Sequence, residues 1–165
     1  MTSSATDGTA DWGAGGAIAV VAGHGDFAAG LVSAIEQITG RGDRLRTLSN
    51  RGLGPAEIEA ELRAIVDAAP VRVIFTDLPA GSCTIAARRV LRDRPALRLV
   101  VGANLPAVID FVLAGDAAPA SDDPEHAVTH AVERGRQSLQ LVAPPAPPAP
   151  PAPQPASGAE VGGAR

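Results

Sequence analysis

Short apolar runs alternate with helix-periodic segments along most of the chain, and this alternation restricts the fold more than any other feature. The apolar runs 17–22, 71–76 and 97–101 are typical of buried strands. Between them, segments such as 26–40 and 55–69 place apolar residues at helical spacing. Parallel strands joined by right-handed crossovers, with helices on both faces, accommodate such an alternation. We therefore predict an α/β fold with an open, doubly wound and mostly parallel sheet.

Weaker patterns complete this prediction. A short strand is expected at 44–48, and further helices at about 82–93, 105–115 and 124–135. The segment Ser138–Val142 is predicted to be a last short strand, which gives a five-stranded sheet. In such sheets the chain often starts in the middle, and a 2-1-3-4 order makes the first and third strands neighbours.

Composition excludes several classes of function. The 165 residues suffice for one domain, and the net charge of -4 without a dense basic run argues against a nucleic-acid partner. No apolar run approaches the roughly 20 residues that cross a bilayer, so direct membrane insertion is not expected. The single cysteine excludes an intrachain disulfide and fits a reducing compartment, so we expect a cytoplasmic location.

The two ends of the chain differ from its middle. Residues 1–16 are mostly small and polar without periodicity, and we predict a disordered leader. Residues 143–165 form an Ala/Pro-rich tail that we also expect to be disordered, with eight of the 15 prolines between 143 and 155. The folded domain is accordingly predicted to span 17–142.

One histidine and one aspartate follow two of the predicted strands. Gly23-His24-Gly25 comes directly after the first strand, and Asp77 ends the strand 71–76. Ligands bind at the carboxyl ends of strands in open α/β sheets, so both residues would flank one crevice. A carboxylate that bonds one ring nitrogen fixes the tautomer and leaves the other nitrogen free to attack. The alternative is that His24 and Asp77 merely end their strands without a chemical role.

A helix is expected to begin directly after this strand, at Gly81-Ser82-Cys83-Thr84, with Ser82 or Thr84 as its cap. Backbone N–H groups and hydroxyls at a helix N-terminus form an anion site. The chain has no lysine, so this is not a Walker loop. Cys83 is either a thiol activated by the helix terminus or, as is more common for a lone cysteine, a packing residue.

His126 and His130 lie four residues apart on the last predicted helix and therefore share one of its faces. Such a pair can bind zinc, but the glutamate of a metalloprotease motif is missing between them. Solvated helix surface is the favoured interpretation, and we predict no metal and no cofactor.

Three motifs within 17–142 match a known family in order and spacing. They are Gly23-His24-Gly25 after the first strand, Thr76-Asp77-Leu78-Pro79-Ala80-Gly81-Ser82 before Ala86-Ala87-Arg88, and Val101-Gly102-Ala103-Asn104-Leu105-Pro106. Together they resemble the IIA domain of the mannose-type sugar phosphotransferase system (PTS). An Ala/Pro-rich linker after the domain also fits that family.

The resemblance implies a phosphotransferase that works through a phosphohistidine intermediate. His24 would accept a phosphoryl group from the phosphocarrier HPr and pass it to a IIB component, while Asp77 holds the imidazole. Gly81, Ser82, Cys83 and Thr84 would contact the phosphate. The resemblance further implies a homodimer, and a five-stranded sheet with one antiparallel edge strand.

The sequence departs from the family pattern in places. Ala80 replaces the first of two glycines before Ser82, and Cys83 stands where a proline is common. About ten residues follow the linker, too few to form a IIB domain. We therefore expect IIB on a separate chain, and two alternatives stay open. One is a regulatory phosphohistidine module without sugar transport, and the other is the phosphoryl-donor subunit of a dihydroxyacetone kinase.

Overall fold

Four parallel strands form the sheet, in the spatial order β2-β1-β3-β4. The computed structural model describes residues 18–117 and 124–144. Its strands are β1 (Ala19–Gly23), β2 (Leu45–Ser49), β3 (Val73–Thr76) and β4 (Arg98–Val101). Its helices are α1 (Phe27–Thr39), α2 (Pro55–Ala68), α3 (Ser82–Arg92), α4 (Leu105–Ala117) and α5 (Pro124–Gln137), with a 3-10 turn η1 (Gly42–Arg44) before β2. The expected 2-1-3-4 order is confirmed, so β1 and β3 are neighbours.

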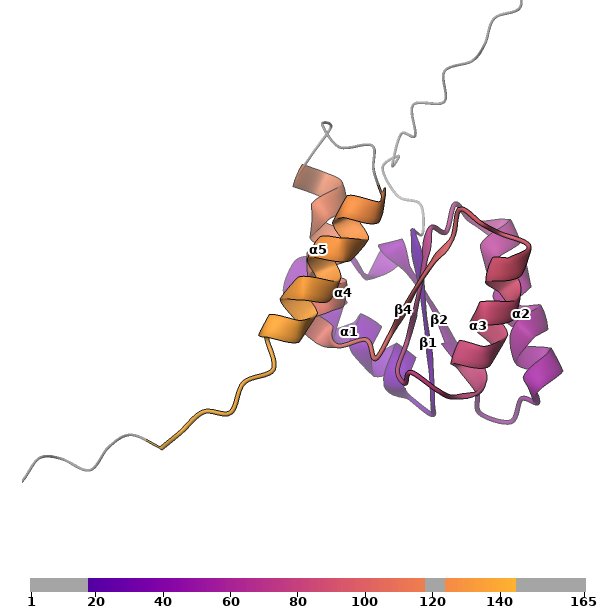
Figure 1. Cartoon of the computed structure of the whole chain (residues 1–165), viewed down its shortest axis with the longest axis horizontal. Coiled ribbons are helices and arrows are strands. Elements are labelled where there is room, and N and C mark those ends of the chain that lie inside the picture. Colours follow the sequence, from indigo (N-terminus) through magenta and orange to yellow (C-terminus); the bar gives the residue numbers. More distant parts are fainter. Residues whose placement is uncertain (1–17, 118–123, 145–165) are drawn as a thin grey trace, which may run out of the picture.

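Helices cover both faces of the sheet, as the alternation of patterns predicts (Figure 1). On one face, α1, α4 and α5 pack on side chains that include Val21 and Phe75. On the other face, α2 and α3 pack on side chains that include Val20 and Ile74. Every residue of β1 is buried, which is why its sequence is continuously apolar instead of alternating.

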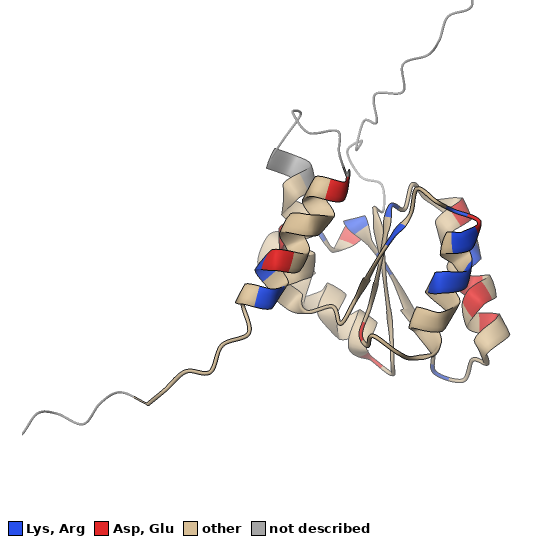
Figure 2. Cartoon of the chain, viewed as in Figure 1, with Lys and Arg blue, Asp and Glu red and all other residues tan. Residues whose placement is uncertain are grey.

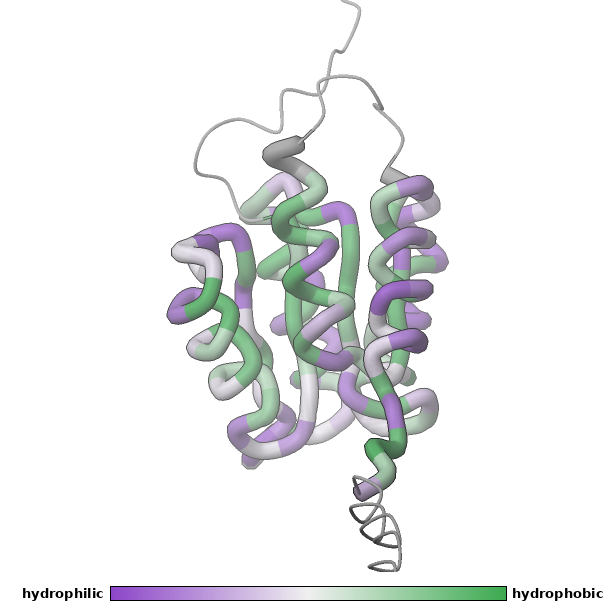
Figure 3. Tube along the Cα trace, turned by 90° about the vertical axis from the view of Figure 1, so that its left-hand side faces the viewer, coloured by the Kyte–Doolittle hydropathy of each residue, from purple (hydrophilic) through white to green (hydrophobic). Residues whose placement is uncertain are grey.

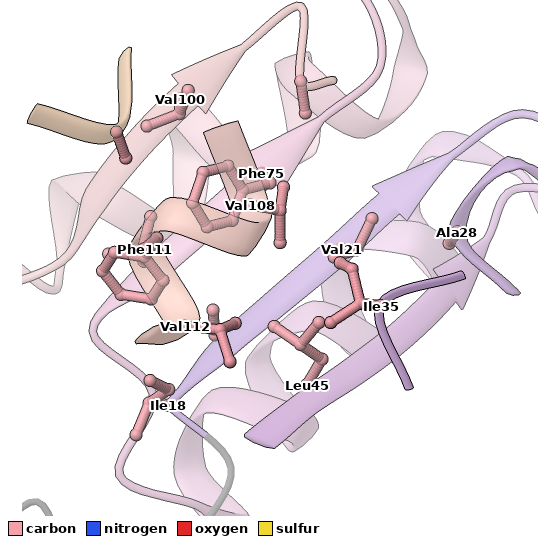
Figure 4. Packing of buried hydrophobic residues seen from close by; sticks show 14 residues of the cluster. Ile18, Val21, Ala28, Ile35, Leu45, Phe75, Val100, Val108, Phe111 and Val112 are labelled. Carbon is pink, nitrogen blue, oxygen red and sulfur yellow. The ribbon is translucent and has the colours of Figure 1, made fainter. Parts of the chain in front are cut away.

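The core under α4 centres on two aromatic rings. Phe75 of β3 and Phe111 of α4 meet edge to face, with centroids 5.4 Å apart and planes at 67° (Figure 4). Val21, Ile35, Leu45 and the valines of α4 belong to the same buried cluster. This packing holds β3, and therefore Asp77 directly after it, in a fixed position in the domain.

Hydrophilic and hydrophobic residues alternate along α5, whereas α4 is hydrophobic along most of its length (Figure 3). Charged residues are numerous on α2 and α3 (Figure 2), where Arg63 bridges Glu59 and Asp93, each at 2.9 Å. Surface pairs of this kind contribute little to stability, because water and salt screen the charges and ordering the long side chains costs entropy. Apolar burial on both faces of the sheet therefore accounts for most of the stability.

The predicted fifth strand is wrong for the described part of the chain. After α5 the segment Ser138–Val142 has no strand partner, and Leu139, Leu141 and Val142 are 89%, 100% and 84% exposed. A strand forms only where a neighbour supplies hydrogen bonds, and this segment runs away from the sheet (Figure 1). The antiparallel edge strand implied by the family resemblance is thus not among the described residues.

The predicted leader 1–16 and residues 145–165 of the predicted tail lie outside the described residues. Of the helices between residues 18 and 144 that the structure describes, none is long and apolar enough to span a membrane.

Candidate functional site

The structure brings His24 and Asp77 together at the carboxyl edge of the sheet. His24 directly follows β1, and Asp77 directly follows the neighbouring strand β3. Oδ2 of Asp77 accepts a hydrogen bond from the backbone N–H of His24 at 2.8 Å. The same oxygen lies 2.7 Å from Nδ1 of the His24 ring. Backbone and ring of one residue are therefore held by one carboxylate oxygen.

The two side chains differ in exposure. The His24 side chain is 49% exposed, whereas that of Asp77 is only 11% exposed. The carboxylate is thus shielded behind the ring that it holds. Because Nδ1 faces Asp77, Nε2 is the ring nitrogen left available to a visiting group.

The pKa of Asp77 lies below its ordinary value. Partial burial is the largest single influence and raises this pKa, but hydrogen bonds from the backbone and ring of His24, its charge when protonated, and the N–H of Leu78 together outweigh it. An ionised carboxylate only accepts hydrogen bonds, so the proton of the neutral ring resides on Nδ1. Nε2 then carries the lone pair, which is the form of imidazole that attacks an electrophile.

The two positions around His24 require glycine for different structural reasons. A Cβ at Gly23 would lie 2.7 Å from Cδ1 of Phe27 and 3.0 Å from Oδ2 of Asp77, so glycine makes room for the carboxylate. Gly25 has a φ of +54°, a left-handed conformation that other residues rarely adopt. Both glycines shape the turn that presents the imidazole.

Three consecutive residues, the last of β2 and the two that follow it, hold this turn in place. Ser49 Oγ donates to the Gly25 carbonyl at 2.7 Å, and the Asn50 N–H donates to the Gly23 carbonyl at 3.1 Å. Arg51 pairs with Asp26 at 3.1 Å, although both side chains are largely exposed. Sequence reasoning missed these three residues. The rule that ligands bind at the carboxyl ends of parallel strands applies to β2 as well as to β1 and β3, and it would have pointed to them.

Helix α3 begins at Ser82, with Gly81 at its N-cap position and without a side-chain cap. The expected capping by Ser82 or Thr84 is therefore wrong. The first intrahelical bond runs from the Ile85 N–H to the Gly81 carbonyl, so the N–H groups of the preceding helical residues point out of the helix end. A Cβ at Gly81 would lie 3.2 Å from Cε1 and 3.9 Å from Nε2 of His24. The positive end of the helix thus lies beside the Cε1–Nε2 edge of the ring.

The side chains of Cys83 and Thr84 are both buried and face the core. Burial, together with the charge of Asp77, raises the pKa of the Cys83 thiol despite a hydrogen bond with Ser82. An activated thiol needs a lowered pKa, so the structure supports Cys83 as a packing residue.

Thr84 holds the loop between β3 and α3. Its hydroxyl donates to the Leu78 carbonyl at 2.6 Å and lies 2.7 Å from the hydroxyl of Thr76. Any contact of Cys83 or Thr84 with an anion at this helix end must therefore come from the backbone N–H groups.

Of the two histidines of α5, His130 lies beside a carboxylate of the neighbouring helix α4. Nδ1 of His130 lies 2.7 Å from Oδ2 of Asp110 on α4, which makes a second imidazole–carboxylate pair. In the part of the chain that the structure describes, no group of three or more His, Cys, Asp or Glu side chains is placed to hold a metal ion.

These observations define a class: an open parallel α/β protein with an exposed, carboxylate-held imidazole at the carboxyl edge of its sheet, facing a helix N-terminus. The family model described as the PTS system fructose IIA component matches residues 18–128. The chain therefore belongs to the mannose/fructose-type IIA family of the phosphotransferase system, as the resemblance of its motifs predicts.

Solved structures of similar fold come from the same system. A chain from Klebsiella pneumoniae assigned to a phosphoenolpyruvate-dependent sugar PTS permease is 27% identical, with a TM-score of 0.65, and the match covers 79% of this chain and 94% of that one. The mannose/sorbose-specific IIA subunit of Enterococcus faecalis is 18% identical, with a TM-score of 0.65 and coverages of 81% and 99%.

A third similar structure is the PTS IIA protein associated with the fucose utilization operon of Streptococcus pneumoniae. It is 24% identical, with a TM-score of 0.63 and coverages of 76% and 93%. At these identities the Enterococcus and Streptococcus structures support the fold alone. Among curated protein sequences, none matches this chain significantly.

Proposed function

We propose that this chain is a phosphocarrier in which His24 accepts a phosphoryl group from HPr and passes it to a IIB component. The observation that carries the proposal is the 2.7 Å contact between Nδ1 of His24 and Asp77, on a ring that is half exposed. This contact leaves Nε2 as the nucleophile. Membership of the PTS IIA family makes a phosphotransferase role the natural use of such a nucleophile.

The transfer step requires little covalent chemistry from the protein. The lone pair of Nε2 attacks phosphorus, a new N–P bond forms, and the bond to the donor nitrogen breaks with its electron pair remaining on the donor. The His24 ring gains positive charge during this step, and the Asp77 carboxylate stabilises that charge through the Nδ1–H. Positioning and charge stabilisation therefore supply most of the catalysis.

The N-terminus of α3 is the proposed binding site for the phosphoryl oxygens. The backbone N–H groups of Ser82, Cys83 and Thr84 and the hydroxyl of Ser82 are the proposed donors, with Gly81 allowing the close approach. A helix N-terminus favours an anion through both its free N–H groups and its dipole. Removal of one such preorganised donor typically slows a reaction by about 10²–10³-fold.

The surface beside His24 suits docking of protein partners. Leu78 and Ile85 are 47% and 51% exposed there. A surface hollow of about 520 Å³ lies next to them, lined by Pro55, Ala80, Gly81, Ser82, Ile85, Ala86 and Arg89. An apolar centre with a polar rim is the usual anatomy of such a surface. HPr and IIB would use it in succession, in the cytoplasm.

We also propose that the chain forms a homodimer. β4 is the last strand at one edge of the described sheet, where it pairs with β3. The apolar residues Leu139, Leu141 and Val142, which follow α5, are exposed. A second copy would cover these three apolar side chains, because a monomer rarely leaves such a patch open to water. Light scattering after gel filtration is expected to give the dimer mass, and a monomer mass at micromolar concentration would contradict the proposal.

Incubation with phosphoenolpyruvate, enzyme I and HPr, followed by mass spectrometry, tests the function. We expect one acid-labile phosphate on wild-type chain and none on His24→Ala. Addition of a IIB protein encoded nearby is expected to remove the label. Label that no IIB protein removes would instead favour a regulatory module.

A further inference from the structure

Asn50 connects the loop after β2 with the N-terminus of α3. Its backbone N–H donates to the Gly23 carbonyl at 3.1 Å, and its own carbonyl accepts from the Leu53 N–H at 3.1 Å. Its position beside the His24 turn is therefore fixed by the main chain. From there its side-chain Nδ2 reaches across 32 residues of sequence to Ser82 Oγ, at 3.2 Å.

Ser82 occupies the helix end that faces the nucleophile. It follows Gly81, whose Cα is close enough to His24 that an added Cβ would lie 3.2 Å from the ring. Asn50 and Ser82 are both partly buried, so their hydrogen bond is shielded from full competition with water. The Ser82 hydroxyl also hydrogen-bonds with the Cys83 thiol, but sulfur is only a weak acceptor.

The direction of this hydrogen bond determines what the hydroxyl can do. An amide NH₂ group donates and does not accept, so Ser82 Oγ is the acceptor from Asn50. The single hydroxyl proton of Ser82 is then left for another acceptor. A phosphoryl oxygen is a charged acceptor, and bonds to such groups are about twice as strong as neutral ones.

We propose that Asn50 is a positioning residue of the phosphoryl site: by donating to Ser82, it directs the Ser82 hydroxyl proton toward a phosphoryl group carried on Nε2 of His24. This inference rests on the proposed phosphocarrier function and names one further residue that it uses. Asn50 acts only through Ser82, and it contacts neither the phosphoryl group nor the imidazole.

Three substitutions separate this role from a purely structural one. Asn50→Ala frees the Ser82 hydroxyl to rotate, and we expect phosphorylation of His24 to slow about five-fold, the effect of one ordinary hydrogen bond. Asn50→Asp is similar in size but supplies only acceptors, so it would take the Ser82 proton and add negative charge. We expect it to be slower than Asn50→Ala, by about ten-fold or more relative to wild type. Ser82→Ala removes the donor itself.

The test uses phosphoramidate as a small phosphoryl donor, so that protein docking does not enter the measurement. In this reaction the N–P bond of the donor breaks, ammonia leaves, and Nε2 of His24 forms the new bond. The rate of labelling is measured on the full chain at several donor concentrations, which separates the maximal rate from the apparent affinity. The hydrolysis rate of the isolated phosphoprotein is the second measurement.

The double variant Asn50→Ala, Ser82→Ala is decisive. If Asn50 acts through Ser82, Asn50→Ala has no further effect in the Ser82→Ala background, so the two effects are not additive. Asn104→Ala is the matched control. Asn104 also follows a strand, but its amide bonds the Gly135 carbonyl and the Ala107 N–H, away from His24. We expect it to change the free energy of unfolding and to leave the labelling rate unchanged.

The outcomes distinguish this inference from the function on which it rests. Wild-type chain that takes no phosphate on His24 overturns both. If wild type is labelled and either Asn50→Ala or Asn50→Asp is labelled at the wild-type rate, the inference alone is overturned. So does an Asn50→Ala defect of equal size with and without Ser82, because it would show that Asn50 acts through the fold.

Discussion

Asp77 holds His24 through a single oxygen atom: Oδ2 accepts the backbone N–H at 2.8 Å and contacts ring Nδ1 at 2.7 Å. The first bond places the residue and the second orients its ring. This pairing is possible because β1 and β3 are adjacent and parallel, so the residues that follow them emerge side by side.

Asn in place of Asp77 tests this relationship. The Asp77→Asn amide no longer carries the charge that stabilises a positive ring, and it no longer fixes the proton on Nδ1. Phosphorylation of His24 by phosphorylated HPr is expected to slow by about 10²–10⁴-fold, as in other sites where a carboxylate orients a reactive imidazole. The matched control is Asp110→Asn, because Asp110 contacts Nδ1 of His130 at the same 2.7 Å. That variant should be labelled at the wild-type rate, and an equally fast Asp77→Asn would contradict the assignment.

The lowered pKa of Asp77 predicts a pH dependence of stability. A carboxyl with a lower pKa in the folded chain than in the unfolded chain stabilises the fold above the unfolded value of about 3.8, and this contribution is lost as the pH falls through the folded-state pKa. The difference in unfolding free energy between wild type and Asp77→Asn should therefore be larger at pH 7 than in strong acid. Urea unfolding at a series of pH values measures it. A difference that stays constant from pH 7 to strong acid would exclude this linkage.

Gly81→Ala tests the approach of α3 to the ring. The new methyl group would lie 3.2 Å from Cε1 of His24, so the ring must shift by a few tenths of an ångström. We expect labelling to slow by about ten-fold, because small displacements of a nucleophile are costly. The control is Gly30→Ala in α1, where nothing outside the adjacent residues and the helix's own backbone lies within 4 Å of the added group. This control should gain about 0.5–1 kcal/mol of stability and keep its labelling rate.

Thr84 is expected to contribute to stability through its hydroxyl. Thr84→Val keeps the shape and removes the hydrogen bonds to Leu78 and Thr76, at a cost of about 1–3 kcal/mol of unfolding free energy. Thr84→Ser keeps the hydroxyl and should lose less. Urea unfolding distinguishes them, and a Thr84→Val chain as stable as wild type would contradict the role given to this buried hydroxyl.

Much of the fold could be predicted from the sequence because β1 and β3 are central strands. Both of their faces are buried, so their sequences are continuously apolar, and the strand order then placed His24 beside Asp77. The segment Ser138–Val142 has the apolar residues of a strand, but pairing depends on a neighbour that local sequence does not specify.

The hydrogen-bond partners at the site were less predictable. Thr84 and Ser82 look equivalent in sequence, yet the two helical steps between them, of about 100° each, turn the Thr84 side chain into the core. The bond from Asn50 to Ser82 joins the loop after β2 to the first residue of α3, and only the three-dimensional fold brings these two residues together.

The position of the phosphoryl group on the His24 ring is the most direct test of the account. Chain labelled through HPr can be examined by mass spectrometry for the residue and by ³¹P NMR for the ring nitrogen. Because Asp77 occupies Nδ1, we predict one phosphate, on Nε2 of His24. Phosphate on Nδ1, label that persists in His24→Ala, or no acid-labile phosphate on wild-type chain would contradict it.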